Sequence, residues 1–314
     1  MKKSYFVSLS MAMVLFLGAC QSEENAEPKS ETVKTEAEVE ESYAVTDDLG
    51  NEVTFEEIPE TVVSLIPSNT EILYALEEGE KLVGATDFDN YPEEALEVER
   101  VSDSVKFNAE RIIQLDPDIV LAYSTGAPTG LEVLEEADIP VFVIESATSF
   151  EDVYGDIEQI AQVMGTEEKG EELIASIQSE IEEVQEKLAA VEEKKEAYVE
   201  ISPLPEIFTT GKNTFQQEIL NHAQVENVFA DLEGWPKLSE EEIIVRNPEL
   251  IFTTVSYVEN AVEEIKARES WSEITAVKDE QVFFLDSDIT SRPGPRIGEA
   301  VKLVAETAYP EILK

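Results

Sequence analysis

The sequence predicts an α/β fold in which two similar parallel-sheet lobes are joined by one long rigid α-helix, with a ligand cleft between the lobes. Two observations favour this architecture. Residues 166–196 carry one apolar stripe with helical spacing, and the segments on either side of them share a motif at a constant offset. A chain of 314 residues is also long enough to give each lobe a core of its own.

The central helix is predicted from apolar residues that recur at spacings of four and three: Ile177, Ile181, Val184, Leu188 and Val191. Gly165 is typical of the end of a preceding helix, Thr166 is typical of an N-cap, and Lys194 and Lys195 suit the last turn. A helix of this length would span ~45 Å. An ordinary amphipathic helix or a coiled-coil arm would carry the same stripe, but the similarity of its flanks favours a strut between two lobes.

The shared motif covers residues 107–120 and residues 238–251. Asn108 aligns with Ser239 and Pro117 with Pro248, without a gap between them. Each copy is predicted to form an N-cap, a short helix, a proline that ends the helix and a buried strand. The register of all these features indicates that one α/β unit was duplicated.

The two lobes are predicted at residues 43–165 and 197–314. Strands and helices alternate within them, which is the pattern of a mainly parallel sheet. The predicted strands are residues 61–66, 81–85, 118–123 and 140–144 in the first lobe and 197–201, 250–255 and 281–285 in the second. The last helix is predicted at residues 295–307.

The N-terminus is predicted to be a lipoprotein signal peptide, residues 1–19. Its apolar run is too short to span a bilayer, and it ends in Leu17-Gly18-Ala19 before Cys20, the only cysteine in the chain. This ending resembles the bacterial lipobox, which implies a lipid on Cys20 and a place on the extracytoplasmic face of the cell membrane; a plain secretory signal with an incidental cysteine is the alternative. Residues 20–42 are acidic and poor in apolar residues, so we expect a flexible tether.

The formal charge of the chain is −48, from 22 basic and 70 acidic residues. This charge argues against binding to nucleic acid, which depends on Lys and Arg that neutralise phosphates. An alkaline or saline habitat and a highly solvated surface without a partner both fit such a charge.

The sequence offers few groups for catalysis or metal binding, which favours a binding protein over an enzyme. His222 is the only histidine, and we expect a surface or capping role for it. Two acid pairs, Asp87 with Asp89 and Asp286 with Asp288, could hold calcium but more often are solvated. No metal site and no resident cofactor are therefore predicted.

Aromatic residues lie at predicted junctions of strands and loops: Phe88 follows the second predicted strand, Tyr123 ends the third, and Trp235 precedes the second copy of the shared motif. Ligands of parallel α/β sheets bind at the carboxyl ends of the strands. Phe88, Tyr123 and Trp235 are therefore expected to form an aromatic wall for a large, partly apolar ligand, although core packing would also use such residues. Arg292 and Arg296, set among Pro and Gly, suggest a fixed anion contact. A structural salt bridge is the alternative for Arg296.

The chain resembles the solute-binding lipoproteins of ABC importers of the cobalamin and iron–siderophore class, which have a single helical linker. The resemblance covers about Tyr43 to Lys314 and rests on residues 63–71, 108–112, 208–212, 235–241, 271–277 and 292–297. It implies a non-enzymatic monomer that captures a metal-containing small molecule and delivers it to a permease dimer.

The resemblance also implies roles for particular residues. Glu110 and Glu241 would dock onto arginines of the permease, although an acid at either place would also suit the helix dipole. The ligand would be bordered by Phe88, Tyr123, Trp235, Asp288 and Arg292. Trp235-Pro236 and the Arg-Pro-Gly-Pro-Arg segment point to cobalamin, whereas Ser104 stands where cobalamin binders can carry a tryptophan. Haem and ferric siderophores therefore stay open as ligands, as does a surface-attached enzyme that handles tetrapyrroles or metals.

Overall fold

The structure is a computed structural model that describes residues 42–103, 106–124 and 130–313. The predicted signal peptide, Cys20, all of the predicted tether except Ser42, and Ser104 lie outside the described residues. Within the described part, no helix combines the length and the apolar character needed to cross a bilayer.

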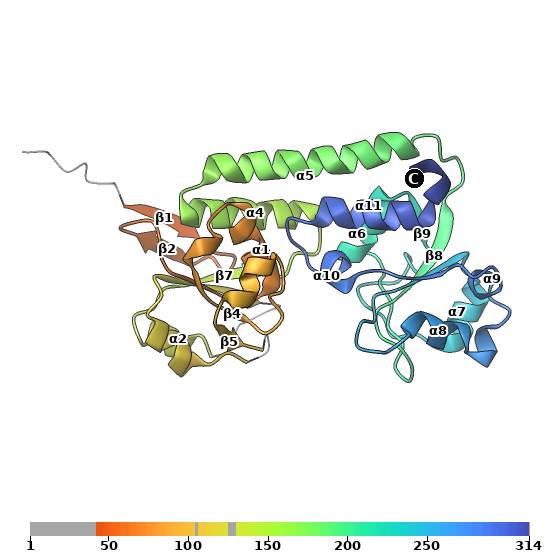
Figure 1. The fold of residues 1–314 in the computed structure, drawn as a ribbon, viewed down its shortest axis with the longest axis horizontal. Helices are drawn as coiled ribbons and strands as arrows, with labels where there is room; N and C mark the ends of the chain where they lie inside the picture. The colour runs from red at the N-terminus through yellow and green to blue at the C-terminus, as the bar shows by residue number, and fades with distance from the viewer. Residues whose placement is uncertain (1–41, 104–105, 125–129, 314) are drawn as a thin grey trace, which may run out of the picture. The chain divides into compact units, whose positions relative to one another are not determined.

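The first lobe is built on a five-stranded parallel sheet with the strand order β5-β4-β3-β6-β7 (Figure 1). A two-stranded antiparallel hairpin, β1–β2, precedes it. The elements of this lobe are β1 (Tyr43–Thr46), β2 (Glu52–Phe55), β3 (Val62–Ser64), α1 (Pro67–Ala75), η1 (Gly79–Lys81), β4 (Leu82–Thr86), η2 (Glu93–Glu97), β5 (Arg100–Ser102), α2 (Ala109–Leu115), β6 (Ile119–Ser124), α3 (Glu132–Glu135), β7 (Val141–Glu145) and α4 (Phe150–Met164).

The second lobe follows the long helix α5 (Glu167–Leu188) and contains a four-stranded parallel sheet with the order β9-β8-β10-β11. Its elements are β8 (Lys195–Glu200), α6 (Phe215–His222), β9 (Val225–Asn227), α7 (Glu240–Arg246), β10 (Leu250–Thr253), α8 (Ala261–Lys266), η3 (Glu269–Trp271), α9 (Thr275–Lys278), β11 (Val282–Phe284), α10 (Ser287–Thr290), α11 (Ile297–Ala308) and α12 (Pro310–Leu313). Two parallel sheets linked by one long helix confirm the predicted fold class.

The duplication extends beyond the shared motif to the order of the strands. The order β4-β3-β6-β7 in the first sheet matches β9-β8-β10-β11 in the second. Helices α2 and α7 begin alike, because the side chains of Asn108 and Ser239 accept hydrogen bonds from backbone N–H groups of the first turn. Both helices also end alike, on a left-handed residue: Asp116 with φ 49° and Asn247 with φ 46°.

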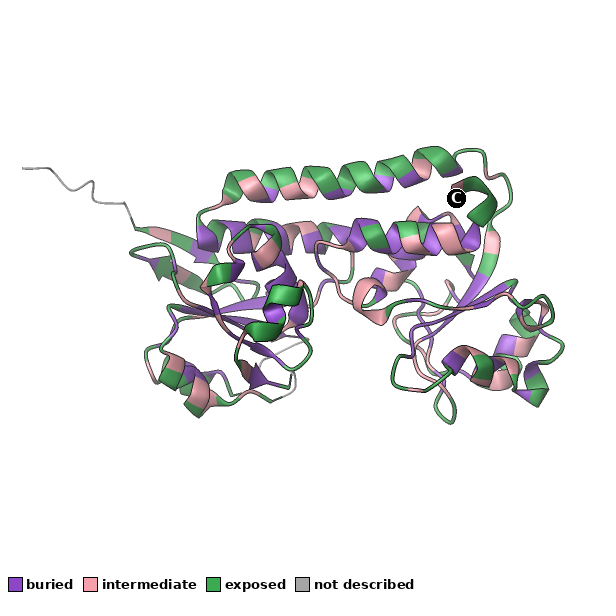
Figure 2. Ribbon diagram, in the orientation of Figure 1, coloured by how far each residue is buried: buried purple, intermediate pink, exposed green. Residues whose placement is uncertain are grey.

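Helix α5 carries the predicted stripe, and Ile177, Ile181, Val184 and Leu188 are all buried. Figure 2 shows that the face of α5 turned away from the lobes is exposed. The predicted end at Glu196 is wrong, because the helix stops at Leu188. Lys195 instead opens β8 and pairs with Val225 of β9, and its Nζ donates to the Ala308 carbonyl at 2.6 Å. Strand pairing therefore overrides the helical propensity of this Glu- and Lys-rich segment.

The two lobes share one apolar core beneath α5. A single cluster of contacting buried residues includes Ile72 and Ile157 from the first lobe, Ile181 from α5, and Phe215 and Val301 from the second. Helix α5 packs against α4 at one lobe and α11 at the other, as the layer in Figure 1 shows. A Cβ at Gly298 would overlap the carboxylate of Glu180, so the glycine lets α11 approach α5 closely without moving that side chain. The lobes are consequently held by packing as well as by the chain.

Asp156 of α4 is a buried acid beside two other acids. Burial, with Asp48 and Asp152 nearby, raises its pKa to about 8. The folded protein therefore binds this proton up to a higher pH than the unfolded chain does. Stability is lost as the pH rises from the ordinary carboxyl range to about 8, because the native state must either keep the proton or bury a charge.

We predict that Asp156→Asn raises the free energy of unfolding, and that the gain is larger at pH 8 than at pH 5 by roughly 1–3 kcal/mol. Urea unfolding at both pH values measures the difference. Asp152→Asn is the matched control of opposite sign. Burial alone would raise the pKa of Asp152, but hydrogen bonds from Thr148 and Ser149 outweigh burial and lower the pKa, so this variant should lose stability. An equal gain of Asp156→Asn at both pH values would contradict the prediction.

Candidate functional site

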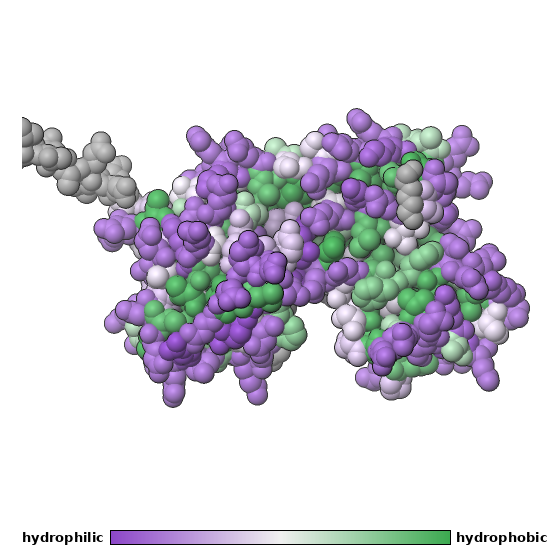
Figure 3. Space-filling model, viewed as in Figure 1, coloured by the Kyte–Doolittle hydropathy of each residue, from purple (hydrophilic) through white to green (hydrophobic). Residues whose placement is uncertain are grey.

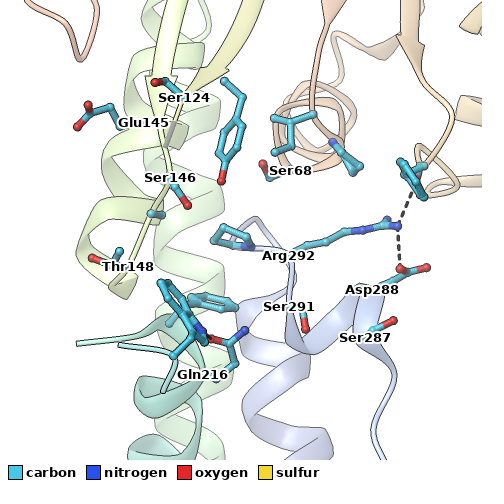
Figure 4. Close-up of a pocket in the computed structure, with 18 residues that line it drawn as sticks. Ser68, Ser124, Glu145, Ser146, Thr148, Gln216, Ser287, Asp288, Ser291 and Arg292 are labelled. Atoms are coloured by element: carbon cyan, nitrogen blue, oxygen red, sulfur yellow. Dashed lines mark hydrogen bonds and ion pairs between the residues drawn. The ribbon is translucent and has the colours of Figure 1, made fainter. Parts of the chain in front are cut away.

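A cavity of about 740 Å³ lies between the two lobes, at the carboxyl ends of the parallel strands. Its walls come from the segments that follow β3, β4, β6 and β7 in the first lobe and from α6, the Trp235 loop and the segment after β11 in the second. Figure 3 shows the surface hollowed between the lobes on the side away from α5, and Figure 4 shows the lining residues. A ligand in this cavity would contact both lobes at once.

Four aromatic side chains line the cavity: Phe88, Tyr123, Phe215 and Trp235. Phe88 is 56% exposed and Trp235 is 46% exposed, which is unusual for large apolar side chains in a folded protein. Rings that are open to a cavity of this size offer flat apolar faces to a ligand. The first two rings come from the first lobe and the other two from the second, so the apolar contact is divided between the lobes.

Trp235 is held by a strap of backbone hydrogen bonds. Gly211 donates its N–H to the Gly234 carbonyl at 2.8 Å, and Thr209 donates to the Pro236 carbonyl at 3.1 Å. A Cβ at Gly211 would overlap the backbone carbonyl of Leu232, so the strap can close only over glycine. The indole Nε1 donates to Gln216 Oε1 at 3.2 Å.

Phe88 is positioned by a buried carboxylate, Asp89. Asp89 accepts a hydrogen bond from the backbone N–H of Thr86 at 2.9 Å and another from its hydroxyl, while the Phe88 N–H donates to the Thr86 hydroxyl at 3.1 Å. Asp89 is only 1% exposed, so the expectation of a solvated acid is wrong at this position. Its role here is to fix the turn that presents Phe88.

Hydroxyl groups form most of the polar part of the cavity: Ser68, Ser124, Ser146, Thr148, Ser287 and Ser291, with the amide of Gln216. Figure 4 shows them arriving from both lobes: from α1 and the ends of β6 and β7 in the first, and from the α6 and α10 regions in the second. Hydroxyls and amides both donate and accept hydrogen bonds, so this lining suits a ligand with many neutral polar groups on its periphery.

Arg292 and Arg296 pair with an acid of the protein itself, the 1% exposed side chain of Glu71 on α1. The Arg292 Nη1 lies 3.0 Å from Glu71 Oε1, and the Arg296 Nη2 lies 2.6 Å from the same oxygen. The anion that these arginines contact is therefore a carboxylate of the protein, and the structural salt bridge given as the alternative for Arg296 is confirmed. Because Glu71 belongs to the first lobe and the arginines follow β11, the network also ties the lobes together.

Further contacts reinforce this tie, which we call the clasp and define as Glu71, Asn90, Asp288, Arg292 and Arg296. Asn90 donates to Asp288 Oδ2 at 2.7 Å, and Arg292 Nη2 lies 2.8 Å from Asp288 Oδ1. The Arg296 guanidinium also lies 4.1 Å from the ring centroid of Tyr91. The clasp lies at one side of the cavity, where Figure 4 shows the Arg292 side chain extended toward Asp288.

The structure brings all five predicted ligand residues to the cavity: Phe88, Tyr123, Trp235, Asp288 and Arg292. Glu110 and Glu241 lie elsewhere, both exposed in the first turns of α2 and α7. Neither carboxylate has an ion-pair or hydrogen-bond partner among the described residues, so both are available to another molecule. Cys20 lies outside the described residues.

His222 ends α6 and packs between the lobes rather than in the cavity. Its ring stacks on Phe150 with 4.8 Å between centroids, and Nδ1 lies 2.7 Å from the Gln185 side chain. Burial lowers the pKa of His222, which keeps the ring neutral at pH 7. Within residues 42–103, 106–124 and 130–313, no group of three or more His, Cys, Asp or Glu is placed to hold a metal ion.

Several site residues were not found from the sequence. Phe215 and Gln216 begin a helix after the N-cap Thr214, and nothing in that local pattern says that the helix points at a cavity. Glu71 follows three polar residues at the start of α1, all of them buried. The sequence shows only that residues 68–71 are polar at the start of a predicted helix. Helical periodicity does not show that they are buried or which side chains they contact.

Comparison with known proteins gives a consistent result. A profile described as periplasmic binding protein matches residues 62–289 of the chain. An uncharacterized ABC transporter substrate-binding lipoprotein of Bacillus subtilis, YvrC, is 40% identical over 98% of this chain and 98% of its own length. A vitamin B12-binding protein of Vibrio parahaemolyticus is 34% identical over 79% of this chain and 88% of its own length.

Solved structures show the same fold. A protein from Staphylococcus epidermidis, described as a possible iron-binding periplasmic solute-binding protein, superposes with a TM-score of 0.73 and 32% identity. The match covers 81% of this chain and 100% of that one.

Proposed function

Because the chain belongs to the periplasmic binding protein family, we propose that it is the extracytoplasmic solute-binding lipoprotein of an ABC importer and that its ligand is a corrinoid such as cobalamin. The family consists of non-enzymatic binding proteins of transporters, which excludes the tetrapyrrole- or metal-handling enzyme.

The composition of the cavity wall supports a corrinoid. Four aromatic rings and a set of hydroxyls surround about 740 Å³, whereas His, Cys and Met are absent from its described lining. A ligand that already encloses its metal and carries many amides needs flat apolar faces and neutral hydrogen-bonding groups rather than a metal ligand. The vitamin B12-binding relative, at 34% identity, is in line with this choice.

Haem is the second candidate because of one side chain. The phenol of Tyr123 lines the cavity, and a tyrosine oxygen can coordinate haem iron. A ferric siderophore is a further possibility that the iron-binding relative supports. Ser104, which stands where cobalamin binders can carry a tryptophan, is the sequence feature that speaks for haem or a siderophore rather than a corrinoid.

We predict that cyanocobalamin raises the melting temperature of the protein more than haem or ferric siderophores do, because only the corrinoid matches both the rings and the hydroxyls. A thermal-shift screen with these ligands measures this. Trp235→Ala should then weaken binding of the best ligand by roughly 1–3 kcal/mol, the effect of losing one large apolar contact.

Tyr257→Ala is the matched control, because this aromatic side chain is 72% exposed and lies outside the cavity lining. Titration by intrinsic fluorescence should give it the affinity of the original protein. If haem raises the melting temperature and the corrinoid does not, the proposed corrinoid ligand is refuted and haem replaces it. Equal affinity of Trp235→Ala and the original protein would remove Trp235 from the site.

The permease-docking role of Glu110 and Glu241 is supported by the duplication. The two acids occupy the same turn of corresponding helices, so the lobes present two equivalent negative groups. A permease dimer would offer two equivalent positive groups, and charge pairs of this kind set docking register and association rate. The local alternative is that each acid only complements its helix dipole, which is worth ~0.3–1 kcal/mol.

We predict that the double variant Glu110→Ala with Glu241→Ala abolishes cellular uptake but leaves ligand affinity and melting temperature nearly unchanged. Uptake of labelled ligand by cells measures transport, and calorimetry measures the ligand affinity and the melting temperature. Glu172→Ala with Glu186→Ala, on the exposed face of α5, removes the same charge and should keep uptake. Normal uptake by the first double variant would leave these acids only their helix-capping role.

The lipid anchor at Cys20 is proposed from the sequence and from the lipoprotein relative, whose match spans 98% of this chain. Cys20→Ala should therefore move the protein from the membrane fraction to the medium, whereas Cys20 itself should incorporate labelled fatty acid. Membrane association that persists in Cys20→Ala would place the anchor elsewhere in the chain.

A further inference from the structure

We propose that Glu71 determines the charge specificity of the cavity: by pairing with and neutralising Arg292 and Arg296, it makes the site select ligands without anionic groups. This inference rests on the proposed function for its choice of corrinoid probes. Glu71 acts through the arginines and does not line the cavity itself, so it is a positioning residue.

The first step is the hydrogen-bonding capacity of Arg292. A guanidinium has two N–H groups on each terminal nitrogen and one on Nε. Nη1 contacts Glu71 Oε1 at 3.0 Å and Asn90 Oδ1 at 2.8 Å, and Nη2 contacts the Phe88 carbonyl at 3.0 Å and Asp288 Oδ1 at 2.8 Å. Three of these contacts are hydrogen bonds and the one to Asp288 is an ion pair, so both terminal nitrogens are engaged by partners within the protein. A ligand carboxylate that approached these nitrogens would have to compete with Glu71 and Asp288 for them.

The second step is the charge of the wall. Among the described lining residues, the ionisable side chains are Arg292, Asp288, Glu145 and the phenol of Tyr123. Arg292 is the only cation in this set, and Glu71 lies behind it with 1% exposure, where a charge is poorly screened. An anionic ligand group would lose its hydration and meet two carboxylates without gaining a cation.

The third step is the position of Arg296. Its Nε and Nη2 lie 2.8 Å and 2.6 Å from the two oxygens of Glu71, so the carboxylate is held by both arginines. Arg296 is absent from the cavity lining. Loss of the Glu71 carboxylate would make the surroundings of the two arginines more positive. Loss of the Arg296 guanidinium would make them more negative, because Glu71 would then be neutralised by Arg292 alone. The two substitutions should shift the potential of the cavity in opposite directions.

A purely structural role makes a different prediction. If Glu71 only ties the lobes together, its loss would weaken every ligand by a similar factor. If it sets the charge of the cavity, its loss changes the ratio of affinities for ligands that differ in charge alone. The ratio is therefore the readout that separates the two roles.

The experiment measures this ratio with two matched pairs of probes on the full chain. Cyanocobalamin is compared with a cobalamin monocarboxylate, in which one peripheral amide is hydrolysed, and haem dimethyl ester is compared with haem. The original protein should prefer the uncharged member of each pair that it binds. Glu71→Gln should reduce that preference by about tenfold, the effect of one partly screened charge.

Two further variants fix the interpretation. Glu71→Asp keeps the charge and should keep most of the preference. Glu200→Gln is the matched control, because Glu200 is an equally buried acid that pairs with Arg268 at 2.6 Å but lies outside the cavity lining. It should lower the melting temperature and leave the preference unchanged.

An unchanged preference in folded Glu71→Gln overturns the inference. If that variant does not fold, Arg296→Gln carries the test, and a preference that fails to increase overturns the inference. A shifted ratio for the haem pair alone, without cobalamin binding, supports the inference while refuting the corrinoid ligand. If cobalamin binds but the ratio does not shift, the corrinoid ligand is supported and the role of Glu71 is overturned. If none of the four probes binds, both the corrinoid ligand and the role of Glu71 are overturned.

Discussion

The apolar core shared by the two lobes is the constraint on which the rest of the structure depends. Helix α5 buries one stripe against α4 at one lobe and against α11 at the other, and the contacting residues form a single cluster. Opening this core would expose side chains that are each worth roughly 1.5–3 kcal/mol when fully buried. Large separation of the lobes is therefore costly, and the cleft is expected to adjust rather than to swing open.

Because the lobes are held together by this core, it fixes both the two walls of the cavity and the spacing of the exposed acids Glu110 and Glu241. The aromatic rings are divided between the lobes, and the clasp joins the lobes at one side of the cavity through a buried carboxylate. A buried ion-pair network contributes little net stability but tolerates few alternative geometries. Packing thus supplies the stability of the arrangement, while the clasp supplies its register. Glu110 and Glu241 lie on helices of the same two lobes, so the shared core also sets the distance between them.

The fold was largely predictable because its signals are local. The stripe of α5, the glycine that ends α4 and the repeated cap–helix–proline–strand unit each express a backbone preference within a few residues. The end of α5 was missed since Lys195 pairs with a strand and a helix end that are distant in sequence. Phe88, Tyr123 and Trp235 were expected at the cavity because ligands of parallel sheets bind where strands meet loops, whereas Phe215 was missed. Asp89 and Glu71 were not, because their burial depends on partners that only the folded chain brings near.

Composition itself constrains what the cavity can recognise. In a chain with 70 acidic and 22 basic residues, an arginine near any buried surface is far more often close to a carboxylate than to another cation. Arg292, Arg296 and Arg268 each form an ion pair with an acid whose side chain is only 1% exposed, so the positive charge of each arginine is opposed within the protein. The excess of acids across the whole protein adds a general field that is unfavourable to anions, and the pairing of Glu71 with the two arginines would act on top of this field, next to the cavity. The cavity wall itself offers aromatic faces and hydroxyls, which are groups that can hold a ligand without using charge.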